Sequence, residues 1–184
     1  MSWKNGTAQY GMVAILIHWV SAVLILALFV LGFLAANIAD PGTKAALLRV
    51  HVPLGLIILA LTLARLFWFL IDRRPAPLAG MPAWQVGAER LVRRLLYLVI
   101  LLMAASGIGM LALSGAGKIL FLGAPGPLPD FWHYRPMAVH VAGAIALLAL
   151  AGLHILAALH HHLVRRDQLL ARMWTRPVAA LHDR

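Results

Sequence analysis

The chain has 184 residues, of which 62% are hydrophobic and only 12% are charged, and it contains no cysteine. This composition excludes an ordinary soluble domain, in which about 25% of the residues are charged. The absence of cysteine also excludes covalent c-type haem, cysteine-bound iron–sulfur clusters and disulfides. A redox cofactor, if there is one, must be held without covalent attachment by other side chains.

Four long apolar stretches follow one another along the chain. We expect membrane-spanning helices at about 12–38, 50–71, 92–114 and 136–163, because about 20 apolar residues cross roughly 30 Å of hydrocarbon as a helix. The first stretch is too long for a cleaved signal, whose apolar part has about 7 to 15 residues. The sequence therefore predicts an all-α integral membrane protein, a single domain over residues 1–184 that forms a four-helix up-and-down bundle.

The segments that join the stretches contain Gly, Pro and polar residues, as turns and loops do, and we expect the second connection to be irregular. A polar lead covers residues 1–11, and the first connection, 37–49, contains a turn sequence at Asp40-Pro41-Gly42. The second connection covers 72–87, and the third, 114–135, is the richest in Gly and Pro.

The basic residues are distributed unequally among these segments. The lead, the second connection with its flanks and the C-terminal tail hold most of the 16 Lys and Arg residues, namely Lys4, Arg65, Arg73, Arg74, Arg90, Arg93, Arg94, Arg165, Arg166, Arg172, Arg176 and Arg184. The first and third connections hold only Lys44, Arg49, Lys118 and Arg135. This positive-inside pattern predicts that both termini are cytoplasmic. The net charge of +10 is then explained by the orientation of the chain in membrane lipid. The same distribution argues against a nucleic-acid partner.

Apart from the run at 160–162, four of the nine histidines lie within the predicted spans, namely His18, His51, His140 and His154. An ionisable side chain there is costly and is a functional candidate. On the fourth helix His140 and His154 are 14 residues apart, which is about 21 Å along the axis and within about 40° of one face. Since neighbouring helices alternate in direction, His51 lies at the depth of His140, and His18 lies at the depth of His154. Two cross-helix pairs result, one near each membrane surface.

Each pair offers two imidazoles for opposite sides of one iron, as a six-coordinate b-type haem requires. Zinc is less suitable, because it takes three or four ligands, often with carboxylates, and the spans contain no Asp or Glu. We therefore predict two haem b groups, with His51 and His140 as ligands on the periplasmic side and His18 and His154 on the cytoplasmic side. Small residues such as Gly55, Gly143 and Gly152 either face a porphyrin or serve plain helix packing. A single such histidine would more simply make a hydrogen bond between helices.

Arg65 is the only Lys, Arg, Asp or Glu between residues 50 and 71, and it lies 14 residues after His51. Its guanidinium either pairs with a propionate of the haem held by His18 and His154 or extends to the cytoplasmic headgroups.

The run at 160–162 contains three histidines, which are either the polar edge of the span or a quinone site. His161 lies seven residues after His154 and so on nearly the same face, where it, or His162, can bind or protonate a quinone. We interpret His133 and His182 as interfacial and tail residues.

The chain resembles the bacterial di-haem cytochrome b(561) family from about residue 9 to 176. The resemblance lies in Tyr10-Gly11 and Ile17-His18-Trp19, in Arg49-Val50-His51, in the spacing of His140 and His154, and in Leu159-His160-His161-His162 before a basic tail. It implies two b haems, the bacterial inner membrane and electron exchange with ubiquinone. In one branch, the superoxide oxidase type, it also implies oxidation of superoxide to dioxygen at the periplasmic face. Some relatives carry a histidine where this chain has Arg93 and Arg94.

The leading hypothesis is accordingly a superoxide:ubiquinone oxidoreductase. Lys44, Arg49, Lys118 and Arg135 would form a positive funnel that concentrates the superoxide anion. The alternative is a cytochrome b membrane subunit that relays electrons between the quinone pool and a partner dehydrogenase or periplasmic redox protein. A haem-free transporter is a third class, but it would be expected to show broken helices and paired intramembrane carboxylates, and the sequence shows neither.

Overall fold

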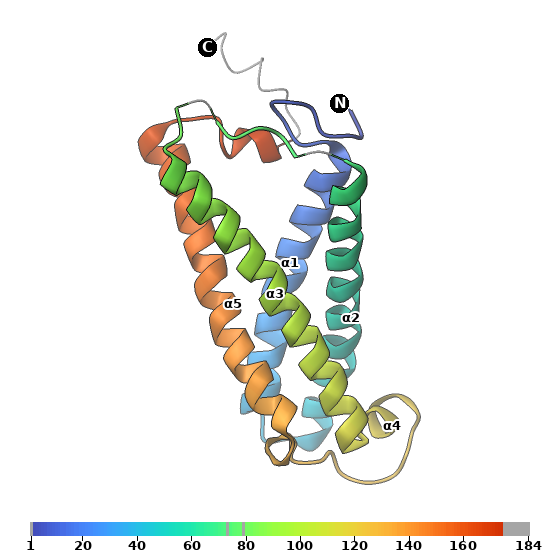
Figure 1. Ribbon diagram of the computed structural model, residues 1–184. Coiled ribbons are helices and arrows are strands. Elements are labelled where there is room, and N and C mark those ends of the chain that lie inside the picture. Colours follow the sequence, from blue (N-terminus) through green and yellow to red (C-terminus); the bar gives the residue numbers. More distant parts are fainter. Residues whose placement is uncertain (1, 73, 79, 175–184) are drawn as a thin grey trace. The chain divides into compact units, whose positions relative to one another are not determined.

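The computed structural model describes residues 2–72, 74–78 and 80–174 (Figure 1). Within these ranges all regular structure is helical, and four helices are long and apolar enough to cross a membrane. They are α1 (Met12–Asn37), α2 (Pro41–Ile71), α3 (Ala83–Ser114) and α5 (Arg135–His160). The predicted all-α fold with four membrane helices is confirmed. Arg73, Arg176, His182 and Arg184, which the sequence singled out, lie outside the described residues.

The described chain divides into two compact units. The first contains the N-terminal residues to Val20, Leu63–Leu96 and the chain from Leu148 onward, and the second contains Ser21–Thr62 and Tyr97–Leu147. Each unit includes a segment of every long helix, so the division does not correspond to a boundary along the sequence.

The long helices expose most of their apolar side chains. Only 11% of the most apolar window of α1 and of α2, and 6% of those of α3 and α5, is buried. Phe33, Phe67 and Leu70 are exposed by 70%, 62% and 81%. In water such a surface would aggregate, but lipid tails are as apolar as a leucine side chain. The exposed faces therefore fit a bilayer as their solvent.

The helix α2 begins earlier than predicted, because Asp40 and Pro41 start a helix rather than a turn. The carboxylate of Asp40 accepts hydrogen bonds from the Thr43 backbone N–H and hydroxyl, both at 2.7 Å, as an N-cap does. These bonds, with that of the hydroxyl the stronger, hold the pKa of Asp40 below its usual range. Pro41 suits the first helical position, where its missing N–H is not needed. The prediction of a turn at Asp40-Pro41-Gly42 was wrong, and Lys44 and Arg49 lie on α2.

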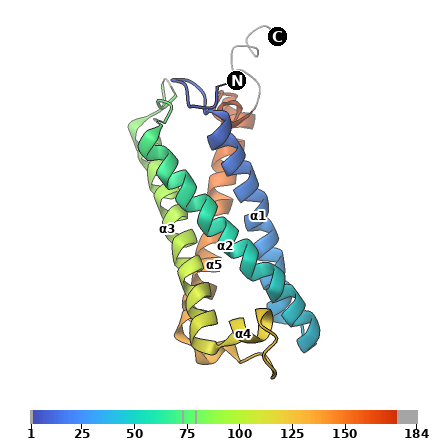
Figure 2. The same ribbon diagram turned by 90° about the vertical axis from the view of Figure 1, so that its right-hand side faces the viewer.

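The third connection also contains helical structure that the sequence did not predict. It contains the short helix α4 (Ala116–Phe121) and the 3₁₀ turn η1 (Phe131–His133), of which α4 is visible beside the end of α3 in Figure 2. Arg49 fixes α4 by donating from Nε to the carbonyl of Leu120 at 2.9 Å. A six-residue helix is too short to be recognised by periodicity, which explains why the sequence did not predict it.

In the first unit, three segments distant in sequence are joined by hydrogen bonds. Ala76 N–H donates to Thr7 at 3.2 Å, and Tyr10 N–H donates to the carbonyl of Arg172 at 3.2 Å. Asn5 N–H donates to the carboxylate of Asp72 at 2.9 Å. The polar lead, the second connection and the C-terminal segment thus form one layer, which we call the cap.

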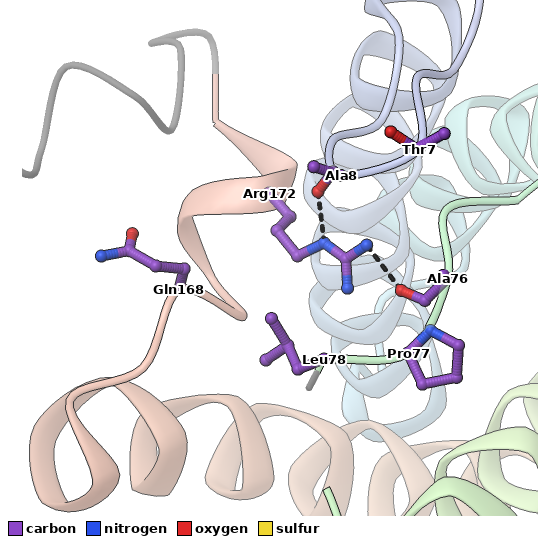
Figure 3. A pocket seen from close by; sticks show the side chains of 7 residues that line it. All are labelled: Thr7, Ala8, Ala76, Pro77, Leu78, Gln168 and Arg172. Carbon is purple, nitrogen blue, oxygen red and sulfur yellow. Dashed lines mark hydrogen bonds between the residues drawn. The ribbon is translucent and has the colours of Figure 1, made fainter. Parts of the chain in front are cut away.

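Arg172 lies at the centre of the cap. Only 7% of the residue is exposed, and its guanidinium donates to the carbonyls of Ala8, at 2.6 Å, and Ala76, at 2.7 Å (Figure 3). An open pocket of about 280 Å³ adjoins it, lined by Thr7, Ala8, Ala76, Pro77, Leu78, Gln168 and Arg172. None of the four histidines of the predicted spans lines this pocket. Arg172 therefore acts here as a clamp between backbone segments.

The substitution Arg172→Ala should destabilise the protein by about 2–4 kcal/mol, because hydrogen bonds from a charged donor contribute about 1.5–3 kcal/mol each and are not additive. Equilibrium unfolding in mixed micelles, followed by circular dichroism, measures the change. Arg90→Ala is the matched control, since Arg90 is exposed. An equal effect of the two substitutions would contradict the clamp.

Candidate functional site

The first unit brings together His18 of α1 and His154 of α5. Their ring centroids are 6.2 Å apart and their ring planes are inclined by 70°. His18 is partly buried, whereas His154 is exposed. We call these two residues the first-unit pair.

The second unit brings together His51 of α2 and His140 of α5. Their centroids are also 6.2 Å apart, with an interplanar angle of 63°, and both side chains are partly buried. We call them the second-unit pair. The helix α5 thus supplies one histidine to each unit, as the spacing of 14 residues predicts.

The ring distance, which is the same in both pairs, suits two imidazoles that bind one metal ion between them. A bond from metal to imidazole is about 2.0–2.1 Å long and the ring centroid lies roughly 1 Å further, so two imidazoles on one iron have centroids about 6 Å apart. Direct edge-to-face contact also allows this distance, but among the described residues no hydrogen bond joins the two rings of either pair.

Each pair has too few protein ligands for a bare metal ion. Within the part of the chain that the structure describes, no three His, Cys, Asp or Glu side chains come together. A structural zinc site needs four protein ligands, whereas a porphyrin supplies four nitrogens itself and leaves two axial positions. Two histidines on facing helices therefore fit haem better than zinc.

In the second-unit pair, the His140 ring is held by hydrogen bonds to uncharged groups. The Nδ1 atom of His140 lies 3.0 Å from Ser106 Oγ and 3.2 Å from the carbonyl oxygen of Met103. Since a carbonyl only accepts, His140 carries its proton on Nδ1 and donates it there. The Nε2 atom then keeps its lone pair, which is the state of a metal-binding histidine.

Gly32 leaves room for the His51 ring, whereas a Cβ atom on Gly107 would make only an ordinary contact with the His140 ring. A Cβ atom on Gly32 would lie 3.2 Å from His51 Cε1, and one on Gly107 would lie 3.6 Å from His140 Cε1. The His51 Nδ1 atom is buried and has no hydrogen-bond partner among the described atoms. A cross-helix contact leaves no local signal, so sequence reasoning missed Gly32.

The other glycines singled out from the sequence lie elsewhere. A Cβ atom on Gly55 or Gly152 would meet nothing within 4 Å, and one on Gly143 would lie 2.7 Å from Met103 Sδ. Gly143 thus serves close packing of α5 against α3, the second of the two roles considered.

The first-unit pair has a cation beside it. Arg65 Nη1 lies 3.2 Å from His18 Nδ1, and because a guanidinium only donates, Nδ1 accepts here. The Nε atom of Arg65 is buried without a partner, and the guanidinium lies 5.9 Å from the Phe69 ring. Arg93, also in this unit, forms an ion pair with Glu89. Pairing of Arg65 with a propionate stays a prediction.

The histidine run after α5 contains one buried member. The π-helical turn η2 (His161–Arg165) follows α5, and Arg166 has a left-handed backbone conformation with φ of 51°. This turn brings the carboxylate of Asp167 to His161 Nδ1. His161 is 9% exposed, whereas His162 is exposed. No sequence pattern identified Asp167 as a partner.

The four cations considered for superoxide all belong to the second unit, as do both members of its histidine pair. Arg49, Lys118 and Arg135 are exposed and Lys44 is partly buried. The described carboxylates of this unit, Asp40 and Asp130, form ion pairs with none of them; Asp130 instead contacts His133. Among the described residues, no carboxylate therefore neutralises the positive charge of these four side chains.

Known proteins resemble the chain over nearly all of its length. Residues 9–176 match the model of the prokaryotic cytochrome b561 family. The chain is 31% identical over 172 residues to cytochrome b562 of Cereibacter sphaeroides, covering 89% of this chain and 94% of that protein. The chain belongs to the prokaryotic cytochrome b561 family. It is thus a multi-pass membrane cytochrome of the b type, from a family that binds haem and transfers electrons.

Two further relatives come from Escherichia coli K12. Cytochrome b561 homolog 2 is 26% identical over 178 residues, which cover 94% of this chain and 95% of the relative. Cytochrome b561 homolog 1 is 27% identical over 176 residues, which cover 91% and 98%. The cytochrome b561 family thus matches this chain along its full four-helix region.

Gly32 provides a test of the second-unit pair. Gly32→Leu should displace the His51 ring and lower the amount of haem bound per protein, because the new side chain would occupy the space beside Cε1. The reduced haem absorbance per protein measures the loss. Gly87→Leu is the control, because nothing lies within 4 Å of a Cβ at that position. Full haem content in Gly32→Leu would contradict the close contact.

Proposed function

We propose that the chain is a di-haem b-type cytochrome of the bacterial inner membrane that moves electrons from superoxide to ubiquinone. The observation that carries this proposal is the presence of two histidine pairs with the same ring distance of 6.2 Å. The first-unit pair would hold one haem and the second-unit pair the other. When bound, haem supplies a carrier that accepts and releases one electron at a time.

The neighbouring groups support this role of the histidines. The carbonyl of Met103 and the hydroxyl of Ser106 orient the His140 ring, and such partners behind a ligand fix its tautomer. Gly32 leaves room beside the His51 ring, because a Cβ atom there would lie only 3.2 Å from Cε1.

The orientation follows from the unequal distribution of charge. The first unit carries the basic residues of the cap and of the start of α3, so the positive-inside rule assigns it to the cytoplasmic side. The second unit then faces the periplasm with Lys44, Arg49, Lys118 and Arg135. Unpaired cations at that surface would raise the local concentration of a small anion.

The overall reaction balances with two superoxide anions for each quinone. Each superoxide loses one electron and becomes dioxygen, and two electrons with two protons convert ubiquinone to ubiquinol. The protons are assigned to the cytoplasmic side, where His161 is held by Asp167. While Nδ1–H donates to the Asp167 carboxylate, the imidazolium form of His161 can donate its second proton from Nε2 to a quinone oxygen. The exposed His162 is a second candidate for the same step.

Replacing each of His18, His51, His140 and His154 by Ala should lower the haem-to-protein ratio from about two to about one, because an iron that loses one of its two axial ligands is held weakly. Haem extraction with protein quantification measures the ratio. His133→Ala is the control, because His133 is exposed. A ratio of one before substitution, or a ratio unchanged by the substitutions, would exclude the two-pair assignment.

Stopped-flow mixing with superoxide tests the electron donor. The oxidised protein should show rapid haem reduction, and Arg49→Gln with Arg135→Gln should slow it by about tenfold at low salt, since steering raises association rates by 10-fold or more. Added salt should slow the unchanged protein and affect the variant less. Arg94→Gln, in the first unit, is the control. Absent reduction, or a rate that ignores both salt and the two substitutions, would refute superoxide as donor.

A further inference from the structure

The two histidine pairs differ in the group that faces the Nδ1 atom of one ring. At His140 this group is the Met103 carbonyl together with the Ser106 hydroxyl. At His18 it is the guanidinium of Arg65. We propose that Arg65 makes the haem of the first-unit pair the more easily reduced of the two, and so sets the direction of electron transfer. This inference rests on the haem ligation proposed above.

The charge of Arg65 is fixed and poorly compensated. A guanidinium stays protonated at any physiological pH, and among the described residues no Asp or Glu forms an ion pair with Arg65. Its charge acts on both His18 and His154. Glu89 and Arg93 also act on His154, but with opposite signs, and they pair with each other. Of the described charged residues that act on the first-unit pair, Arg65 is therefore the one without an ionic partner.

A nearby cation favours the reduced form of an iron site, because the oxidised iron carries one more positive charge. The effect is larger inside a membrane protein than in water, since the low dielectric constant strengthens the repulsion. Net charge near the site is one of the main determinants of reduction potential. Arg65 thus raises the potential of the first-unit haem.

In the second-unit pair, the hydrogen bond of a histidine ligand lowers the reduction potential of the haem. By donating from Nδ1 to the Met103 carbonyl, His140 becomes a more basic ligand, and a more basic ligand stabilises the oxidised iron. Within the described residues, no Lys, Arg, Asp or Glu hydrogen-bonds to His51 or His140. The Arg65 cation in one unit and the basic His140 ligand in the other therefore both predict that the second-unit haem has the lower reduction potential.

Arg65 raises the potential of the first-unit haem even when its guanidinium moves on haem binding. A neutral His18 that accepts at Nδ1 carries its proton on Nε2, so ligation through Nε2 requires Arg65 to release Nδ1. The nearest new partner of suitable chemistry is a haem propionate. There the guanidinium would offset a negative charge that otherwise favours oxidised iron, so the direction of the effect is unchanged.

A redox titration of the haem-loaded protein, followed by visible spectra, tests the inference. Two components are expected, and His18→Ala should remove the one of higher potential. Arg65→Gln should lower the potential of that component and leave the other in place, whereas Arg65→Lys should retain most of the wild-type value. If Arg65→Gln moves neither component, or moves the lower one, the proposal is overturned.

Two controls separate charge from structure. Arg94→Gln should leave the component of higher potential unchanged, because Arg94 is an exposed cation of the same unit. The double variant Glu89→Gln with Arg93→Gln removes a neutral pair and should leave both potentials close to their starting values, and a shift as large as that of Arg65→Gln would contradict the role of net charge. If Arg65→Gln loses haem, Arg65→Lys gives the decision, since it keeps the charge and must keep the higher potential. Failure of the di-haem function itself would appear separately, as a haem-to-protein ratio below two.

Discussion

The structure depends on the cost of placing imidazole rings among lipid-facing helices. A polar side chain in hydrocarbon must find a partner, and the four histidines of the long helices meet this need in two pairs. The helix α5 contributes to both pairs because residues 14 apart in a regular helix share a face. That one geometric fact gives each unit one histidine pair, and it supports the proposal of a cytochrome with two redox centres.

The two pairs resemble each other in distance and differ in chemistry. One is supported by a carbonyl and a hydroxyl, and the other lies beside a guanidinium. If each pair holds one haem, these neighbours place the two on different potentials without any change in the ligands themselves. One arginine and one backbone carbonyl would then be enough to make electron transfer from one haem to the other favourable.

The two units also differ in their surface contacts. The first unit ties its N-terminal lead, second connection and C-terminal segment together through Arg172, and it carries His161 with its partner Asp167. The second unit keeps a short helix, α4, fastened by Arg49, and leaves its cations without ionic partners among the described residues. The first unit thus presents a histidine–carboxylate pair, and the second presents cations.

The sequence by itself determined the four membrane helices, because long uncharged stretches have few other solutions in lipid. It also determined which histidines could share a depth, because helical rise is constant. Asp40 and Pro41 carried a helix start that was interpreted as a turn, although the N-cap signal was present. Only the tertiary structure decided that Gly32 faces His51, that Met103 and Ser106 face His140, and that Asp167 meets His161. Such contacts depend on the rotation and tilt of neighbouring helices, and helices that are apolar on every side do not reveal from their pattern which face turns inward.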